Sequence, residues 1–246
     1  MISAIIIRRF RRKLTRLRLQ PIRVFCLHQV SFEYDPIRCF ECDWLNIDVF
    51  KQSMTSMLKH YTFISLPEAR TKLAHDLFRI KRYATLTFDD GYRSNLPILR
   101  WLDSINVPYT LFLNGKYLDG KSCSPHILKH ARQTETDISE KSLVAGLYFS
   151  PDDIKSLLAT TGSHGYEHID ATLIDKDCFK ESVKNNYSSF ELNGIPSIPF
   201  HAYTWGKHNS DTDEILRELG ITPVLIDNEK NYNDPNAIHR ELFPIY

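Results

Sequence analysis

The stretch 84–92 reads Ala-Thr-Leu-Thr-Phe-Asp-Asp-Gly-Tyr, and it decides how the chain is expected to fold. Its first five residues are typical of a buried strand, which the Asp-Asp-Gly sequence ends abruptly. Side chains of consecutive strand residues point to opposite sides, so Asp89 and Asp90 are not both expected to bind one ion. One carboxylate is expected to bind it, and the other to remain available for proton transfer. Gly91 lets the backbone leave the strand in a conformation that other residues rarely adopt.

Two histidines further along the chain complete the pattern. His164 and His168 lie four residues apart, a spacing that brings two rings to one face of a helix or of a tight turn. Asp-Asp-Gly alone is usually a solvated turn, and His-x3-His alone is often a pair of surface residues. Here each pattern adjoins a strand-like segment. Together they predict a divalent metal site that leaves open positions for water and substrate.

Five segments of the chain are similar to one known family. These segments are Val24–Val30, Thr87–Tyr92, Asn106–Leu113, Ser163–His168 and His201–Lys207. They resemble the motifs of the polysaccharide deacetylases, the NodB-homology family or carbohydrate esterase family four. The last segment resembles the Phe-Ala-Tyr-Pro-Tyr-Gly version of the family's third motif. The similarity runs from about Ile22 to the end of the chain.

The resemblance implies an α/β fold, a distorted and incomplete (β/α)7 barrel. Strand-like and helical segments alternate along the chain, as a mostly parallel α/β fold requires. We therefore expect one catalytic domain at 21–246, with its site at the carboxyl ends of the strands. Asp48, Ser65 and Ser150 are each expected to cap a helix.

The resemblance also implies a role for each motif residue. Asp89 would be the general base, and Asp90, His164 and His168 would hold the metal ion. The backbone N–H of Trp205 would stabilise the developing oxyanion. Two histidines and one carboxylate are an ordinary ligand set for Zn²⁺, and they also suit Co²⁺, Ni²⁺ or Fe²⁺. Family members remove N-acetyl groups, less often O-acetyl groups, from glycans that contain amino sugars.

The proton donor and the sugar contacts are less clearly marked. His239 and His28 are both candidates for the general acid, and a histidine in either place is more often a packed residue. Tyr92, Tyr203 and Trp205 flank the motifs, and their aromatic faces suit stacking on a sugar ring. We expect them to bind an acetylated amino-sugar glycan or a lipid-linked sugar.

The third motif departs from the family pattern at two positions. Ala202 replaces an arginine that many members carry, so Asp89 is expected to lack its orienting partner. Thr204 replaces a proline and loosens the turn. These departures leave an alternative open, a catalytically impaired descendant that only binds glycan. A phosphoryl-transfer enzyme is disfavoured, because no Asp-x-Asp sequence with a lysine and further acids is apparent.

The charge is distributed unevenly along the chain. Segment 1–20 holds seven of the 31 Lys and Arg residues and no acid, so 24 basic residues face 30 acidic ones in the remainder. An acidic body argues against a nucleic-acid partner, whereas the basic segment could lie on an anionic membrane or form a frayed tail. Because no export signal is recognised, we expect a cytoplasmic protein, peripheral to the inner membrane face if that segment binds lipid. The polar stretch 116–147 is expected to be a lid or an insertion.

Overall fold

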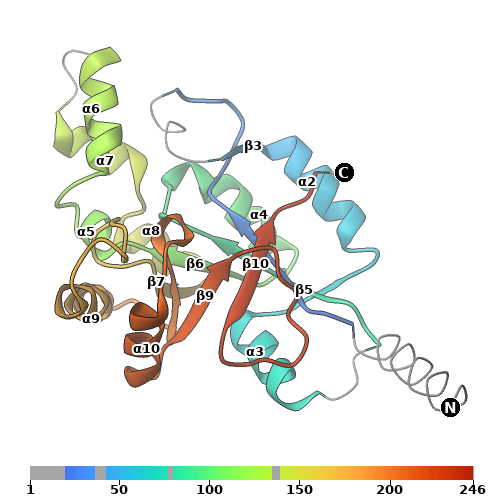
Figure 1. The fold of residues 1–246 in the computed structure, drawn as a ribbon. Coiled ribbons are helices and arrows are strands. Elements are labelled where there is room, and N and C mark those ends of the chain that lie inside the picture. Colours follow the sequence, from blue (N-terminus) through green and yellow to red (C-terminus); the bar gives the residue numbers. More distant parts are fainter. Residues whose placement is uncertain (1–19, 37–42, 77–79, 135–138, 246) are drawn as a thin grey trace, which may run out of the picture.

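The computed structural model describes residues 20–36, 43–76, 80–134 and 139–245 of the chain. The basic segment predicted at 1–20 falls outside these residues except for Gln20. Within the described part, seven parallel strands form a ring in the order β1-β5-β6-β7-β8-β9-β10, and β10 pairs with β1 to close it (Figure 1). The strands are β1 (Arg23–Leu27), β5 (Tyr83–Phe88), β6 (Tyr109–Leu113), β7 (Thr160–Ser163), β8 (Phe200–Ala202), β9 (Thr222–Ile226) and β10 (Ile238–Leu242). The (β/α)7 barrel expected from the sequence is therefore confirmed.

The barrel is distorted in two places. A single residue pair, Ser163 with His201, joins β7 to β8. The short strand β4 (Thr62–Phe63) pairs with the beginning of β5 outside the ring. A small separate sheet, β2 (Gln29–Ser31) with β3 (Trp44–Asn46), follows β1 in the chain, at the carboxyl end of that strand.

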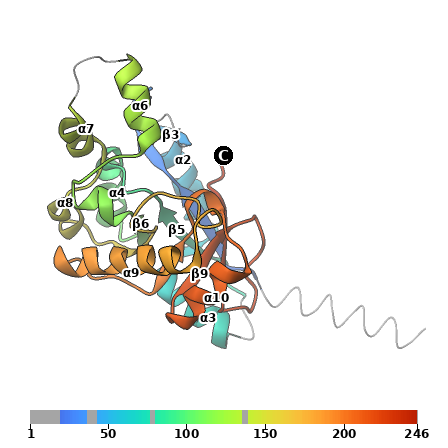
Figure 2. The same cartoon turned by 60° about the vertical axis from the view of Figure 1, so that its left-hand side comes forward.

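Helices surround the strands (Figure 2). They are α2 (Ile47–Met57), α3 (Leu66–His75), α4 (Leu96–Ser104), α5 (Gly115–Leu118), α6 (Pro125–Thr134), α7 (Glu140–Leu147), α8 (Pro151–Lys155), α9 (Lys176–Leu192) and α10 (Ser210–Glu218). Ser65 and Ser150 cap α3 and α8 as predicted, and Ser150 forms a full capping box with Asp153. The cap of α2 is Asn46 and not Asp48, because the Asn46 side chain accepts from the Asp48 N–H at 2.9 Å.

The stretch 116–147 is an insertion of helices between β6 and β7. Helices α6 and α7 stand away from the barrel at one end of the molecule (Figures 1 and 2). Their apolar side chains, with those of Tyr92, Tyr117 and Tyr148, form a separate hydrophobic cluster. The insertion thus has a small core of its own, and it meets the site through Tyr92.

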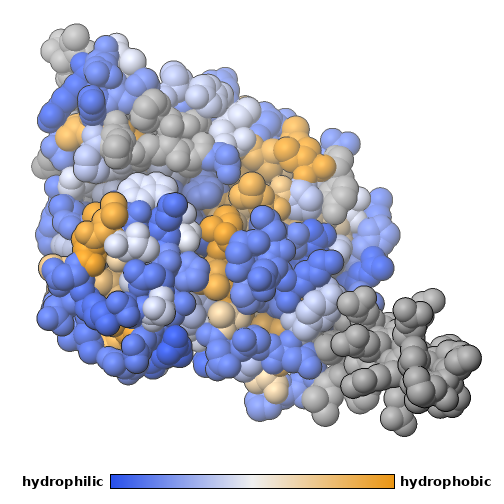
Figure 3. Space-filling view, viewed as in Figure 1, coloured by the Kyte–Doolittle hydropathy of each residue, from blue (hydrophilic) through white to orange (hydrophobic). Residues whose placement is uncertain are grey.

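The barrel interior is narrow and closely packed. The Phe112 ring lies inside against Gly162 on the next strand, where an added Cβ would come within 2.6 Å of the ring. The surface over α10 is mainly hydrophilic (Figure 3). None of the helices in the described ranges is both long and apolar enough to cross a membrane.

Candidate metal centre

The two aspartates lie at the end of β5, where the backbone changes direction. The Asp89 N–H donates to the Leu27 carbonyl at 2.9 Å, which extends the pairing of β5 with β1. Asp90 (φ 69°) and Gly91 (φ +76°) then adopt left-handed conformations. The expected departure of the chain at Gly91 is confirmed, but the extended geometry expected for the aspartates is wrong. Because β5 ends at Phe88, both carboxylates line the same pocket.

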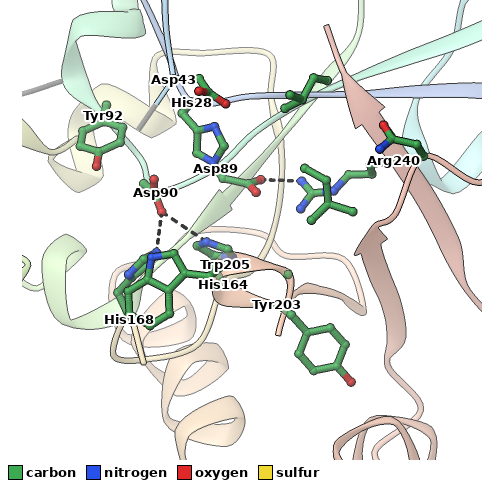
Figure 4. A pocket seen from close by; sticks show the side chains of 14 residues that line it. His28, Asp43, Asp89, Asp90, Tyr92, His164, His168, Tyr203, Trp205 and Arg240 are labelled. Carbon is green, nitrogen blue, oxygen red and sulfur yellow. Dashed lines mark hydrogen bonds and ion pairs between the residues drawn. The ribbon is translucent and has the colours of Figure 1, made fainter. Parts of the chain in front are cut away.

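The two histidines lie on an irregular loop after β7, not on a helix. Gly165 (φ +81°) turns the loop, and the Asn114 amide holds it by donating to the His164 carbonyl at 2.7 Å and the Gly165 carbonyl at 3.1 Å. As a result both rings face Asp90. Its Oδ1 lies 3.2 Å from Nε2 of His164 and 3.2 Å from Nε2 of His168 (Figure 4).

The hydrogen bonding of His164 makes this cluster a fitting cation site. Its Nδ1 lies 2.8 Å from the Ala202 carbonyl, an acceptor, so Nδ1 carries a proton and donates there. In the neutral ring, Nε2 then carries no proton, and its lone pair faces the Asp90 carboxylate. Asp90 Oδ1 is buried without a well-formed hydrogen bond. Two acceptor atoms that face each other at 3.2 Å, here His164 Nε2 and Asp90 Oδ1, need a cation between them, either a proton or a metal ion. A backbone carbonyl that fixes the tautomer of the ring is typical of metal-binding histidines.

The electrostatics of the cluster agree with that interpretation. Burial raises the pKa of Asp90, but the close approach of the His168 and His164 rings, each at 3.2 Å, outweighs burial and holds the pKa far below its usual range. Burial lowers the pKa of His164, but the adjacent Asp90 carboxylate and the charge of Asp89 outweigh burial and raise the pKa overall. The pocket therefore holds an ionised carboxylate that attracts positive charge.

Arg240 on β10 is an orienting partner for Asp89, which was expected to lack one. Its Nη1 donates to Asp89 Oδ1 at 2.7 Å and to the Thr87 hydroxyl at 3.1 Å, and the side chains of the ion pair are 1% and 3% exposed. Burial raises the pKa of Asp89, but the Arg240 charge outweighs it and holds the carboxyl below its usual range. The expectation was wrong because the arginine comes from the last strand of the ring instead of from the third motif. An arginine two residues after Ile238, on the same side of the strand as that buried residue, was the only signal in the sequence.

The two candidate proton donors are placed differently. His28, directly after β1, lines the pocket and its ring points toward Asp89 (Figure 4). Its Nδ1 is buried without a hydrogen-bond partner. His239 does not line the pocket, and its Nδ1 lies 2.7 Å from Asp227 Oδ2. Adjacent strand residues point to opposite sides, so His239 faces away from the side on which Arg240 meets Asp89.

The three aromatic residues predicted to bind sugar also differ in exposure and in where their rings point. Trp205 is 48% exposed, its ring lies 4.5 Å from the His168 ring, and its backbone is left-handed with φ 52°. Tyr92 forms a buried wall of the pocket and stacks on Tyr148. Tyr203 is a buried packing residue whose hydroxyl donates to Asp213 at 2.8 Å, and its ring points away from the two aspartates (Figure 4). Tyr203 is nevertheless among the residues that line the pocket, so its contact with a sugar stays a prediction.

These residues enclose a pocket of about 610 Å³ at the carboxyl ends of the barrel strands. That volume is within the usual range for small-molecule sites. β1, β5, β7, β8 and β10 each deliver a residue to it, which matches the position expected for the site of a parallel barrel.

The comparisons with known proteins agree with the fold and the motifs. Residues 79–224, more than half of the chain, match the family model described as polysaccharide deacetylase. The chain therefore belongs to the polysaccharide deacetylase family. No curated protein matches the sequence.

Several solved structures share the fold. IcaB from Ammonifex degensii is 19% identical, with a TM-score of 0.71 over 92% of this chain and 93% of that one. The deacetylase PplD from Streptococcus pyogenes, solved in complex with acetate, is 17% identical, with a TM-score of 0.70 over 92% and 93%. The deacetylase domain of BpsB from Bordetella bronchiseptica is 17% identical, with a TM-score of 0.65 over 90% and 95%. At these identities the likeness extends to the fold alone.

Proposed function

We propose that this chain is a metal-dependent hydrolase that removes acetyl groups, N-acetyl groups in particular, from a glycan or glycan precursor containing amino sugars. The observation that carries the proposal is the arrangement of the two aspartates. Asp90 belongs to a group of three side chains whose potential ligand atoms lie within 4.8 Å of one another, while Asp89 is held beside them by Arg240 and is not part of that group. In metal-assisted hydrolysis one carboxylate can hold the ion while a second, unligated one acts as the general base, and this arrangement suits both roles.

Asp90, His164 and His168 would hold the ion, with Zn²⁺ as the first expectation. A bound divalent ion would polarise the acetyl carbonyl and lower the pKa of its water toward neutrality. The loop geometry supports one ion in this cluster, because Asn114 and the Ala202 carbonyl fix the position and tautomer of His164 before any ligand arrives.

Asp89 would accept the proton of the attacking water. Arg240 binds its Oδ1. Oδ2, whose contact with the Cys26 thiol is a weak one of 3.5 Å, would accept the proton, and the guanidinium keeps the carboxylate ionised. The Trp205 backbone N–H would stabilise the developing oxyanion, and His28 would deliver a proton to the leaving amine. His28 is preferred over His239 because it alone of the two lines the pocket.

The alternative is an impaired descendant that binds glycan without cleaving it. The replacements at Ala202 and Thr204 favour it. The buried ion pair of Asp89 with Arg240 weighs against it, since a protein that only binds sugar gains nothing from an oriented, unligated carboxylate. The exposed Trp205 beside His168 suits sugar binding under either proposal.

The test is acetate release by protein stripped of metal and reloaded with one equivalent of Zn²⁺. The substrates would be N-acetylated and O-acetylated oligosaccharides and lipid-linked sugars. Asp89→Asn should keep the ion and lose activity by roughly 10²–10⁴-fold, the usual contribution of a general base. Asp227→Asn, which removes a carboxylate bound to His239 outside the pocket, is the matched control and should retain activity. Glycan binding by the wild type without acetate release from any substrate would support the impaired descendant instead.

A further inference from the structure

Three further metal-ligand side chains lie beside the proposed centre. Cys26, His28 and Asp89 each offer one ligand atom within 4.8 Å of the others. None of the three belongs to the cluster of Asp90, His164 and His168. Cys26 is a free, buried thiol that the proposed mechanism does not use.

The strand register brings these side chains together. Cys26 on β1 pairs with Thr87 on β5, and the chains continue to His28 and Asp89 at the same end of the barrel. Cys26 Sγ lies 3.5 Å from Asp89 Oδ2, the oxygen that Arg240 does not bind. His28 contributes one ring nitrogen to this group, and its Nδ1 is buried without a hydrogen-bond partner. A thiol, an imidazole and a carboxylate oxygen thus face one another with their binding atoms uncommitted to strong partners.

We propose that Cys26, His28 and Asp89 form a second metal site, which takes a soft or borderline divalent ion such as Zn²⁺, Cd²⁺ or Co²⁺. Sulfur and imidazole ligands select such ions over Mg²⁺ or Ca²⁺. On binding, a metal–sulfur bond forms, the S–H bond breaks, and the thiol proton leaves to solvent, so no oxidant or reductant is needed.

This site fills after the first one. The first cluster has two histidines and an ionised carboxylate already converging on one point. The second must release a thiol proton, and it lies next to the Arg240 guanidinium, which repels a cation. A second ion therefore binds only at metal concentrations above those that load the first cluster.

The second ion inhibits the enzyme, a consequence that rests on the proposed function. It occupies Asp89 Oδ2 and the His28 ring, the two groups assigned to accept and to donate a proton. Activity should therefore rise with the first equivalent of Zn²⁺ and fall with excess, by roughly 10²-fold or more if proton transfer to the base is lost. Excess Mg²⁺ should leave activity unchanged.

The test separates binding from activity. Metal-stripped protein would be titrated with Co²⁺, and the bound ions counted while thiolate-to-cobalt charge-transfer absorption is recorded. Wild type should bind a second ion with the appearance of that absorption. Cys26→Ser should bind one ion at the same metal concentrations and show none of it.

A matched control removes the other thiols. A variant with Ser at Cys39, Cys42, Cys123 and Cys178 keeps Cys26 alone. It should still bind the second ion, and its activity ratio between one equivalent and excess Zn²⁺ should match wild type, whereas Cys26→Ser should lose this inhibition. Equal ion counts and equal inhibition in wild type and Cys26→Ser would overturn the proposal. The count of bound ions decides the second site even if no substrate is cleaved, and acetate release at one equivalent tests the function even if no second ion binds.

Discussion

Replacing Arg240 by Met should reveal how strongly the fold depends on its ion pair with Asp89. Both side chains are almost fully buried, and their charged atoms lie 2.7 Å apart. Removing one partner of such a pair leaves an uncompensated charge in the interior, which costs about 3–5 kcal/mol. Asp89→Asn should cost a similar amount, because it leaves the guanidinium unpaired. The double variant removes both charges and should be more stable than the sum of the single losses predicts, by roughly 1–3 kcal/mol.

The assay is urea unfolding of the four proteins, free of metal, at pH 7. Arg23→Met is the control, because Arg23 binds Glu241 on the same strand as Arg240 but both side chains are more than a quarter exposed. A pair at that exposure contributes about 1 kcal/mol or less. If the loss of unfolding free energy in the double variant equals the sum of the losses in the Arg240 and Asp89 single variants within about 0.5 kcal/mol, the two residues are not coupled. The account of how Asp89 is oriented would then be refuted.

Three further predictions concern the barrel interior and the metal cluster. Burial holds the pKa of His201 at about 3, against 6.5 for an unperturbed histidine. Because the folded protein keeps this ring neutral while the unfolded chain takes up a proton, the folded state loses stability as the pH falls below 6.5. Unfolding free energy should drop by about 2 kcal/mol more in wild type than in His201→Phe between pH 7.5 and 5, and parallel curves would contradict the assignment. Gly162→Ala should destabilise the protein by about 1–3 kcal/mol, because its Cβ meets the Phe112 ring, and Phe112→Leu in the same chain should recover part of that loss in thermal unfolding. Zn²⁺ at a hundredfold excess over its dissociation constant should raise the free energy of unfolding of wild type by about 2.7 kcal/mol. It should leave that of the double variant Asp90→Asn with His164→Ala nearly unchanged, and an equal increase in both proteins would place the ion elsewhere.

Much of the site could be predicted because its residues carry local signals. Asp-Asp-Gly after a buried strand and His-x3-His after another are short patterns whose meaning depends only on where each strand ends. Parallel strands then bring those ends together without further information. The caps at Ser65 and Ser150 were equally local, since a hydroxyl and the third backbone N–H of the helix lie within one turn.

Arg240 and His28 could not be assigned in that way. Arg240 lies 151 residues from Asp89, and only the closure of the ring between β10 and β1 brings it there. The choice between His28 and His239 depended on which side of a strand each ring faces, which a shift of one residue reverses. In the insertion 116–147, the apolar residues of α6 and α7 pack with each other and with Tyr92, Tyr117 and Tyr148. These two helices are short, at 10 and 8 residues, and they pack in a cluster that the barrel strands do not share.

The assignment of the first ion to Asp90, His164 and His168 can be measured by X-ray absorption at the zinc edge, on protein loaded with one equivalent of Zn²⁺. The expected neighbours are nitrogen and oxygen only, with the scattering pattern of two imidazoles from His164 and His168 and one carboxylate oxygen from Asp90. Asp89→Asn should give the same spectrum, because Asp89 is not a ligand of this ion. A sulfur neighbour at about 2.3 Å in wild type would place the first ion on Cys26 and contradict the account.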